Sequence, residues 1–171
     1  MDQESARLIT EAFKAEGIDL VVTLPEEPTS SLTNSLREDP YFTVVNAASE
    51  GSGIAATAGA AFGGRKAMFV TGIAGLLVGT WALSQTGTIF GAPMLIMASY
   101  RGDFGDITGI PGSQLAMFRS VAEPLLNALR VPYMVIDSRA TLKRKIHDAL
   151  FACHDYEQPV VMLLTGEVLW P

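Results

Sequence analysis

One carboxylate stands in a long stretch of the sequence that otherwise has no charge. Residues 46–64, NAASEGSGIAATAGAAFGG, contain Glu50 as their single charged residue. A carboxylate is costly to bury among small and apolar side chains, so its position needs a reason. One reason is purely structural, because a first-turn carboxylate stabilises a helix N-terminus by about 0.3–1 kcal/mol. The residues that follow Glu50 favour a second, functional reason for its position.

The segment after Glu50 predicts a helix with an unusually smooth surface. Glycine inside a helix costs about 1 kcal/mol relative to alanine, yet Gly51, Gly53 and Gly59 all fall in this segment. Such a helix is tolerated where another backbone or a flat ligand packs against it. The pattern matches a dinucleotide-binding fingerprint only loosely, because Ala56 stands where the third glycine is required.

Other residues of catalytic type lack the partners that their chemistry requires. Gly102-Asp103-Phe104, followed by Asn127, matches part of a Gly-Asp-Gly…Asn magnesium motif, but the third glycine is missing. His147 and His154 have no further ligand at metal-binding spacing, so we expect them on the surface. These residues are interpreted as structural, and the sequence predicts no metal site in this chain.

Composition sets limits on the class of protein. The 171 residues predict one globular domain, residues 1–171, with 49% hydrophobic and 18% charged residues. A net charge of −6 argues against nucleic acid as the main partner. The single cysteine, Cys153, excludes an internal disulfide and favours a reducing, cytoplasmic location. The polar start MDQESARL predicts no signal peptide.

The stretch from residue 67 to residue 100 has no charged residue. Glycines, polar residues and Pro93 interrupt it before about 18 consecutive apolar residues accumulate, so we expect no membrane span. A buried strand, a helix and a second buried strand explain it better, and we expect Trp81 and the methionines in the core. The low overall charge also indicates that another chain covers part of the surface.

The order of elements predicts an α/β fold. Short apolar segments without alternation indicate strands buried on both faces, as in a parallel sheet between two helical layers. We expect a three-layer α/β/α architecture with a six-stranded parallel sheet. The predicted strands are 19–24, 41–46, 66–71, 93–99, 132–137 and 159–165, and the predicted helices are 5–16, a helix capped by Ser30 or Ser31 and running to 37, a helix starting near 50, 75–90, 114–129 and 139–153.

Ligands of such sheets bind outside the carboxyl ends of the strands. The segments expected to line a site are therefore 25–30, 46–53, 71–76 and 100–114.

The sequence resembles the pyrimidine-binding domain of thiamine diphosphate-dependent enzymes. The resemblance covers almost the whole chain and rests on two blocks in the correct order, EGSGIAATAGA and SYRGDFGD, followed by LLNALRVPYMVID. Within that family it is similar to the alpha subunits of sulfopyruvate decarboxylases and to the matching half of phosphonopyruvate decarboxylases.

The resemblance gives Glu50 a role: hydrogen bonding to ring nitrogen N1′ of the cofactor's aminopyrimidine. It implies thiamine diphosphate as cofactor and a separate beta subunit that carries the pyrophosphate-binding domain with its Mg²⁺. The cofactor would lie across the interface between the two subunits of a hetero-oligomer, and this chain alone would be inactive.

Further positions follow from the resemblance. Thr71, Gly72 and Gly75 are expected against the aminopyrimidine, in a loop whose glycine spacing differs from the family's pattern and which lacks its asparagine. Pro25 and Glu26 are expected at the substrate end of the cleft. Gln114 is expected to donate a hydrogen bond near the reacting carbon. Arg101 is expected to bind an anionic substrate group, or alternatively to pair with Asp103 or Asp106.

These expectations lead to a two-chain 2-oxoacid decarboxylase that converts sulfopyruvate to sulfoacetaldehyde and CO₂. The alternatives within the enzyme class are a phosphonopyruvate decarboxylase and a subunit of a split acetolactate-synthase-like carboligase. Outside it, a nucleotide- or CoA-binding module without chemistry and a silent regulatory partner remain open.

Overall fold

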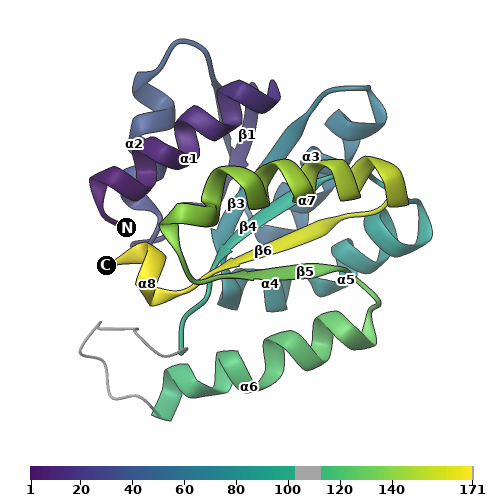
Figure 1. Ribbon diagram of the computed structural model, residues 1–171. Helices are drawn as coiled ribbons and strands as arrows, with labels where there is room; N and C mark the ends of the chain where they lie inside the picture. Colours follow the sequence, from purple (N-terminus) through teal and green to yellow (C-terminus); the bar gives the residue numbers. More distant parts are fainter. Residues whose placement is uncertain (103–112, 171) are drawn as a thin grey trace.

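The structure, a computed structural model, is a six-stranded sheet with helices on both faces (Figure 1). It describes residues 1–102 and 113–170, without the side chains of residues 113–116. The sheet order is β2-β1-β3-β4-β6-β5 and every pair is parallel, which confirms the predicted architecture. The strands are β1 (Leu20–Thr23), β2 (Thr43–Asn46), β3 (Ala67–Gly72), β4 (Leu95–Ser99), β5 (Tyr133–Ile136) and β6 (Val160–Leu164).

The helices form two layers, one on each face of the sheet. The first layer contains α1 (Gln3–Glu16), α2 (Ser30–Glu38), α7 (Leu142–Tyr156) and α8 (Gly166–Leu169), with the 3₁₀ turn η2 (Arg139–Thr141) leading into α7. The second layer contains α3 (Glu50–Phe62), α4 (Ile73–Val78), α5 (Thr80–Leu83), the π-helical segment η1 (Ser84–Ile89) and α6 (Ser113–Ala128).

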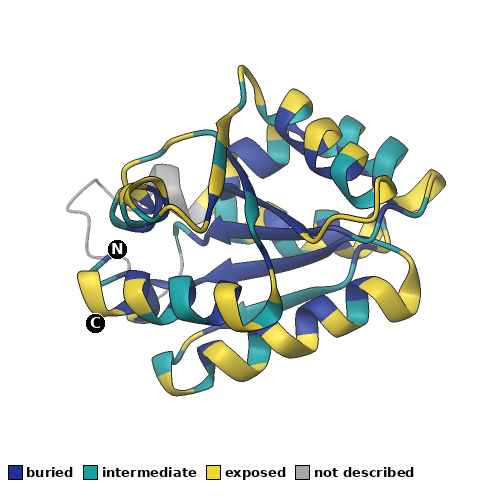
Figure 2. Ribbon diagram, turned by 90° about the horizontal axis from the view of Figure 1, so that it is seen from above, coloured by how far each residue is buried: buried dark blue, intermediate teal, exposed yellow. Residues whose placement is uncertain are grey.

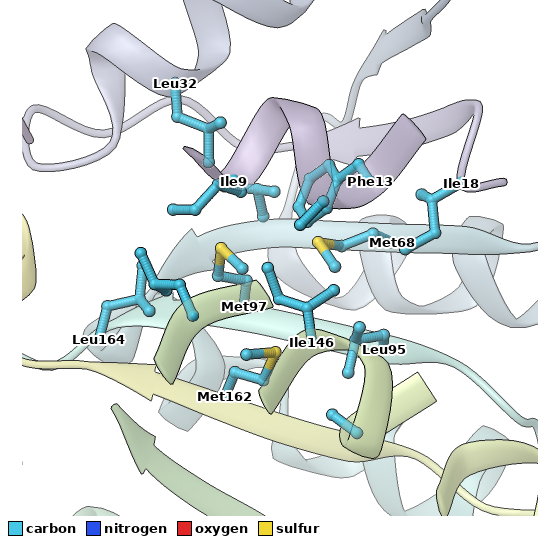
Figure 3. Close-up of a cluster of buried hydrophobic side chains, with 14 of the residues drawn as sticks. Ile9, Phe13, Ile18, Leu32, Met68, Leu95, Met97, Ile146, Met162 and Leu164 are labelled. Carbon is cyan, nitrogen blue, oxygen red and sulfur yellow. The ribbon is translucent and has the colours of Figure 1, made fainter. Parts of the chain in front are cut away.

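The central strands are buried on both faces, as their uninterrupted apolar sequences predict. Every residue of β3, β4 and β6 is buried, and side chains alternate between the two helical layers. Met68, Met97 and Met162 pack together with Ile9 and Phe13 under the first layer (Figure 3). From above, buried strands lie between helices whose outer sides are exposed (Figure 2). The edge strand β2 differs from the expectation, because it is largely exposed.

The helix expected over residues 75–90 is not continuous. It starts earlier, at Ile73, stops at Gly79, and resumes as α5 and the wider η1. Gly79 packs so closely on Ile54 that a Cβ there would lie 2.6 Å from Ile54 Cδ1. Within the described part of the chain, no helix has the length and apolar character required to span a membrane.

Three local predictions are wrong. The N-cap of α2 is Thr29, which makes no side-chain capping bond, and not Ser30 or Ser31. The predicted core residue Trp81 is exposed, and Met117 on α6 is exposed as well. Periodicity places a residue on one side of a helix, but it does not tell whether that side faces the sheet or solvent.

Candidate functional site

The order of the strands reverses between β1 and β3, since the chain moves outward from β1 to β2 and then returns to build the other side. Open parallel sheets bind ligands at this point, outside the carboxyl ends of the strands. The segments after β1, β2, β3 and β4 therefore contribute to one region. They carry Glu26, Glu50, Gly75 and Arg101, respectively.

Glu50 is held at the first residue of α3 by a capping box. The Ser49 hydroxyl accepts a hydrogen bond from the Ser52 backbone N–H at 3.2 Å, and the Ser49 N–H donates to Ser52 Oγ at 3.0 Å. This reciprocal pair fixes where the helix begins. The Glu50 side chain is half-buried, with part of its surface open to solvent.

The Glu50 side chain lies against residues from the end of β3 and from α4. A Cβ at Gly75 would lie 2.7 Å from both Glu50 Cγ and Oε1 and 2.8 Å from Thr71 Oγ1, so only glycine fits between them. A Cβ at Gly79 would lie 3.3 Å from Glu50 Cβ. The structure thus brings together Glu50, Thr71 and Gly75, which the sequence had placed near one another. Thr71 and Gly72 end β3 and Gly75 lies in α4, so the predicted loop is much shorter than expected.

The inner face of α3 explains part of its glycine content. A Cβ at Gly53 would lie 2.4 Å from Phe69 Cε2 on β3, so glycine allows this helix to approach the sheet. On the outer face, Ala55, Ala56 and Gly59 are exposed. On its inner side this helix therefore packs against the ring of Phe69, not against another backbone as expected, while Ala55, Ala56 and Gly59 remain exposed on its outer side.

Substitutions at two glycines of α3 are expected to have opposite effects. Gly53→Ala should destabilise the fold by about 1–3 kcal/mol, because the buried Phe69 ring must move. Gly59→Ala, whose Cβ would meet nothing within 4 Å, should stabilise it by about 0.5–1 kcal/mol through helix propensity. Urea denaturation of the two variants measures both changes. Equal effects would contradict the proposed packing of α3 on β3.

Glu26 lies against Gly72, at the start of the β3–α4 turn. A Cβ at Gly72 would lie 1.9 Å from Glu26 Oε2, so the carboxyl takes the space that a side chain at position 72 would fill. Burial raises the pKa of Glu26. Smaller effects of the Ser99 and Thr29 hydroxyls, and of the positive charges of Arg101 and the Met1 amino group, lower it without cancelling the effect of burial.

Buried polar atoms surround this carboxyl. Glu26 Oε1, Thr29 Oγ1 and Ser99 Oγ are enclosed, and within the described residues none of them has a hydrogen-bond partner of good geometry. Buried polar groups are normally paired, so these atoms mark a place where a ligand or water is expected. Sequence reasoning missed Thr29 and Ser99; the position of Ser99 at the carboxyl end of β4 was the available signal.

Of the other residues predicted to bind substrate, the structure describes the side chains of Pro25 and Arg101. Pro25 is exposed beside Glu26, and the Arg101 guanidinium lies 5.7 Å from the centre of the Trp170 ring, a cation–π contact that the sequence did not predict. The side chain of Gln114 and the alternative partners Asp103 and Asp106 lie outside the described residues.

Asn127, His147 and His154, interpreted as structural from the sequence, lie within the described part of the chain, and the two histidines are on the surface, as expected. Asn127 donates a hydrogen bond to the Tyr133 hydroxyl at 3.3 Å. His147 and His154 are exposed on α7, and His147 lies 3.0 Å from Glu16. Across residues 1–102 and 113–170, no three His, Cys, Asp or Glu side chains gather as a possible metal site.

Four neighbouring elements of the second helical layer, α3, α4, α5 and η1, carry exposed apolar side chains at or next to their ends. We call the outer surface of these elements the α3–η1 face; its exposed apolar side chains are Phe62, Val78, Trp81, Ile89 and Phe90. Residues 51–64 and 67–100 contain no charged residue, so Glu50 is the carboxylate at the start of this surface. Exposed apolar patches of this kind mark interaction sites, and interface centres are depleted in charge.

Comparison with known proteins identifies relatives at the level of sequence and of fold. The chain is 26% identical over 160 residues to the sulfopyruvate decarboxylase subunit alpha of Methanococcus maripaludis, covering 94% of this chain and 93% of the relative. No family model matches. This relative confirms the resemblance predicted from the sequence.

Solved structures share the fold at low identity. A 2-oxoglutarate:ferredoxin oxidoreductase from Magnetococcus marinus matches with a TM-score of 0.71 and 18% identity, and a benzoylformate decarboxylase from Polynucleobacter necessarius with 0.76 and 16%. Each match covers 96% of this chain but only 29% and 30% of the longer chains. The fold is therefore that of one domain in these larger enzymes.

Proposed function

We propose that this chain, which has the fold of a thiamine diphosphate enzyme domain and resembles a sulfopyruvate decarboxylase alpha subunit, is the pyrimidine-binding subunit of a two-chain 2-oxoacid decarboxylase. The observation that carries the proposal is the placement of Glu50. Its carboxyl group opens a smooth glycine- and alanine-rich helix, at the edge of an uncharged apolar face and at the switch point of the sheet.

The residues around Glu50 fit a flat heterocycle. Gly75 and Gly79 leave room for the Glu50 side chain where any larger residue would clash with it, and Thr71 adds a hydroxyl to the same place. Thiamine diphosphate, when bound, supplies the electron sink that a 2-oxoacid needs to lose CO₂. Glu50 would hold a proton between its carboxyl group and ring nitrogen N1′, while the glycine turn orients the ring.

A partner subunit completes the site in this proposal. The α3–η1 face supports it, because a partner on that face would exclude water from Glu50 and from the ring. Without water, a carboxyl and a ring nitrogen share a proton more readily. We assign the pyrophosphate-binding residues and Mg²⁺ to this beta subunit.

The substrate would enter from the side of Glu26 and Arg101. Arg101 suits a second anionic group such as a sulfonate, since charge-assisted hydrogen bonds from a guanidinium bind such groups well. The Trp170 ring beneath the guanidinium limits the positions that Arg101 can take. Sulfopyruvate is the substrate that we propose on this basis.

Reconstitution tests the proposed function. Decarboxylation of sulfopyruvate, phosphonopyruvate and pyruvate is measured with thiamine diphosphate and Mg²⁺ for the chain alone and for the chain with its beta subunit. We expect decarboxylation only when both subunits are present, and we expect the highest rate with sulfopyruvate. Robust activity of the isolated chain would refute the shared site, and preference for another acid would correct the substrate. A pair that binds but never decarboxylates would favour a non-catalytic module.

A further inference from the structure

The segment that follows β6 is held firmly at the carboxyl end of the sheet. It contains α8 and Trp170, and α8 lies beside the N-terminus in Figure 1. The Asp2 backbone N–H donates a hydrogen bond to the Leu169 carbonyl at 2.8 Å, and the Ser5 hydroxyl donates one to the Val168 carbonyl at 2.7 Å. Trp170 is half-buried and packs against the hydrophobic cluster of the first layer. These contacts fix the place of the Trp170 ring.

The Arg101 side chain meets this ring from the segment after β4. The Tyr100 backbone N–H donates a hydrogen bond at 2.7 Å to the carbonyl of Leu164, the last residue of β6, which ties the chain after β4 to the end of β6. The Arg101 guanidinium carbon lies 5.7 Å from the centre of the Trp170 ring, within the range of about 6 Å for a cation–π contact. The contact thus joins the segments that follow two neighbouring strands.

The Arg101 guanidinium also belongs to the region of the proposed substrate site. Ser99, at the end of β4, is in register with Gly72, against which Glu26 packs. Burial raises the pKa of Glu26, and the positive charge of Arg101 opposes this rise. Because such an electrostatic effect weakens with distance, the guanidinium lies close enough to act on a ligand beside Glu26.

We propose that Trp170 is a positioning residue that sets the preference of the site for 2-oxoacids with a second anionic group. This proposal rests on the proposed function and deepens it. The ring holds the Arg101 guanidinium where that group of the substrate binds. A guanidinium is planar, so it can stack on a ring and donate hydrogen bonds from the N–H groups at its edge.

The gain comes from holding Arg101 in place before the substrate binds. An arginine side chain has several rotatable bonds, and ordering them during binding costs conformational entropy. The Trp170 ring removes part of this cost for an acid whose second anionic group contacts Arg101. Pyruvate has no such group, so its binding should not depend on Trp170.

The test measures kcat and KM of the complex of both subunits. In Trp170→Leu, which keeps an apolar side chain against the core, the KM for sulfopyruvate should rise about 3- to 30-fold, the range for loss of a cation–π contact. The kcat and the KM or competitive inhibition constant of pyruvate should stay within about twofold. Tyr156→Leu removes an exposed ring from α7 in the same layer and is the matched control, which should change neither acid's KM.

A conservative variant and a double variant separate positioning from packing. Trp170→Phe keeps an aromatic ring and should recover most of the affinity for sulfopyruvate. Arg101→Gln removes the charge, and in this background Trp170→Leu should have no further effect on the KM, because the ring acts through the guanidinium. An equal effect of Trp170→Leu with and without Arg101 would overturn the proposal.

The stacking itself has a readout that needs no turnover. In NMR spectra of the full chain with isotope-labelled arginine, the guanidinium signal of Arg101 is assigned by its loss in Arg101→Gln. The ring current of Trp170 should shift this signal, and Trp170→Leu should return it to the position of exposed arginines. A signal that does not move in Trp170→Leu would overturn the proposal, even if this variant fails to assemble with the beta subunit.

The outcomes separate this proposal from the proposed function. A wild-type complex that decarboxylates no 2-oxoacid would refute both. If the complex decarboxylates sulfopyruvate and Trp170→Leu changes the KM of both acids equally, or of neither, the role of Trp170 is wrong and the proposed function stands. A wild-type complex that binds pyruvate as tightly as sulfopyruvate would also overturn the role of Trp170, since the second anionic group would then not be recognised.

Discussion

Replacing Glu50 by glutamine should lower the turnover of the two-subunit complex by about 100- to 10,000-fold, the range for loss of a catalytic proton-transfer group. Glutamine fits the space beside Gly75, where a Cβ would already lie 2.7 Å from the Glu50 carboxyl, so the fold and the assembly should persist. The measurement is steady-state decarboxylation at saturating thiamine diphosphate, together with a melting curve and the mass of the complex.

The control for this variant is Glu4→Gln. Glu4 is also a first-turn acid, at the start of α1, so its replacement removes a similar helix-dipole contribution of about 0.3–1 kcal/mol. We expect both variants to lose a little stability and only Glu50→Gln to lose activity. Near-normal turnover of Glu50→Gln would show that Glu50 stabilises the helix N-terminus and has no catalytic role.

Replacing Trp81 by aspartate should weaken association with the beta subunit by about 30-fold or more, since buried tryptophans at interface centres contribute 2 kcal/mol or more to binding. Trp81 is 76% exposed and lies on the α3–η1 face with Val78, which is 74% exposed. An aspartate there would carry an unpaired charge into an interface built from residues 67–100, a segment without any charged residue. Titration calorimetry with the beta subunit measures the dissociation constant.

Phe151→Asp is the matched control for Trp81→Asp. Phe151 is 65% exposed on α7, in the other helical layer, and the same exchange of an aromatic side chain for a charge should leave the affinity unchanged. Both variants should melt like the wild type, because neither side chain belongs to the core. Equal affinities of the two variants would show that the partner binds elsewhere.

The positions of the acids were only partly accessible from the sequence. Glu50 was found because it interrupts a long uncharged stretch and follows a strand. Glu26 was named from its place in a loop after the first strand, but its contact with Gly72 depends on β1 and β3 being neighbours in the sheet. That neighbourhood follows from the strand order, which the periodicity of a single segment does not encode.

The exposure of Trp81 is a second example of a feature that the sequence pattern does not predict. A large apolar side chain in an apolar segment favours the core, but the interruption of the helix at Gly79 turns Trp81 outward while Leu83 stays buried. A sequence pattern reports that a residue avoids water. It does not distinguish burial in its own fold from burial against a partner.

The sequence by itself determined the alternation of strands and helices, the parallel sheet and the carboxylate at the start of α3. These features depend on apolar segments and glycine content, which are read within a single segment of the chain. Tertiary structure alone decided that Glu50 and Glu26 lie against Gly75 and Gly72 of one turn, that the Thr29 and Ser99 hydroxyls lie beside Glu26, and that Arg101 lies on Trp170. These contacts join residues far apart in the chain, and only the packing of the strands in one sheet brings them together.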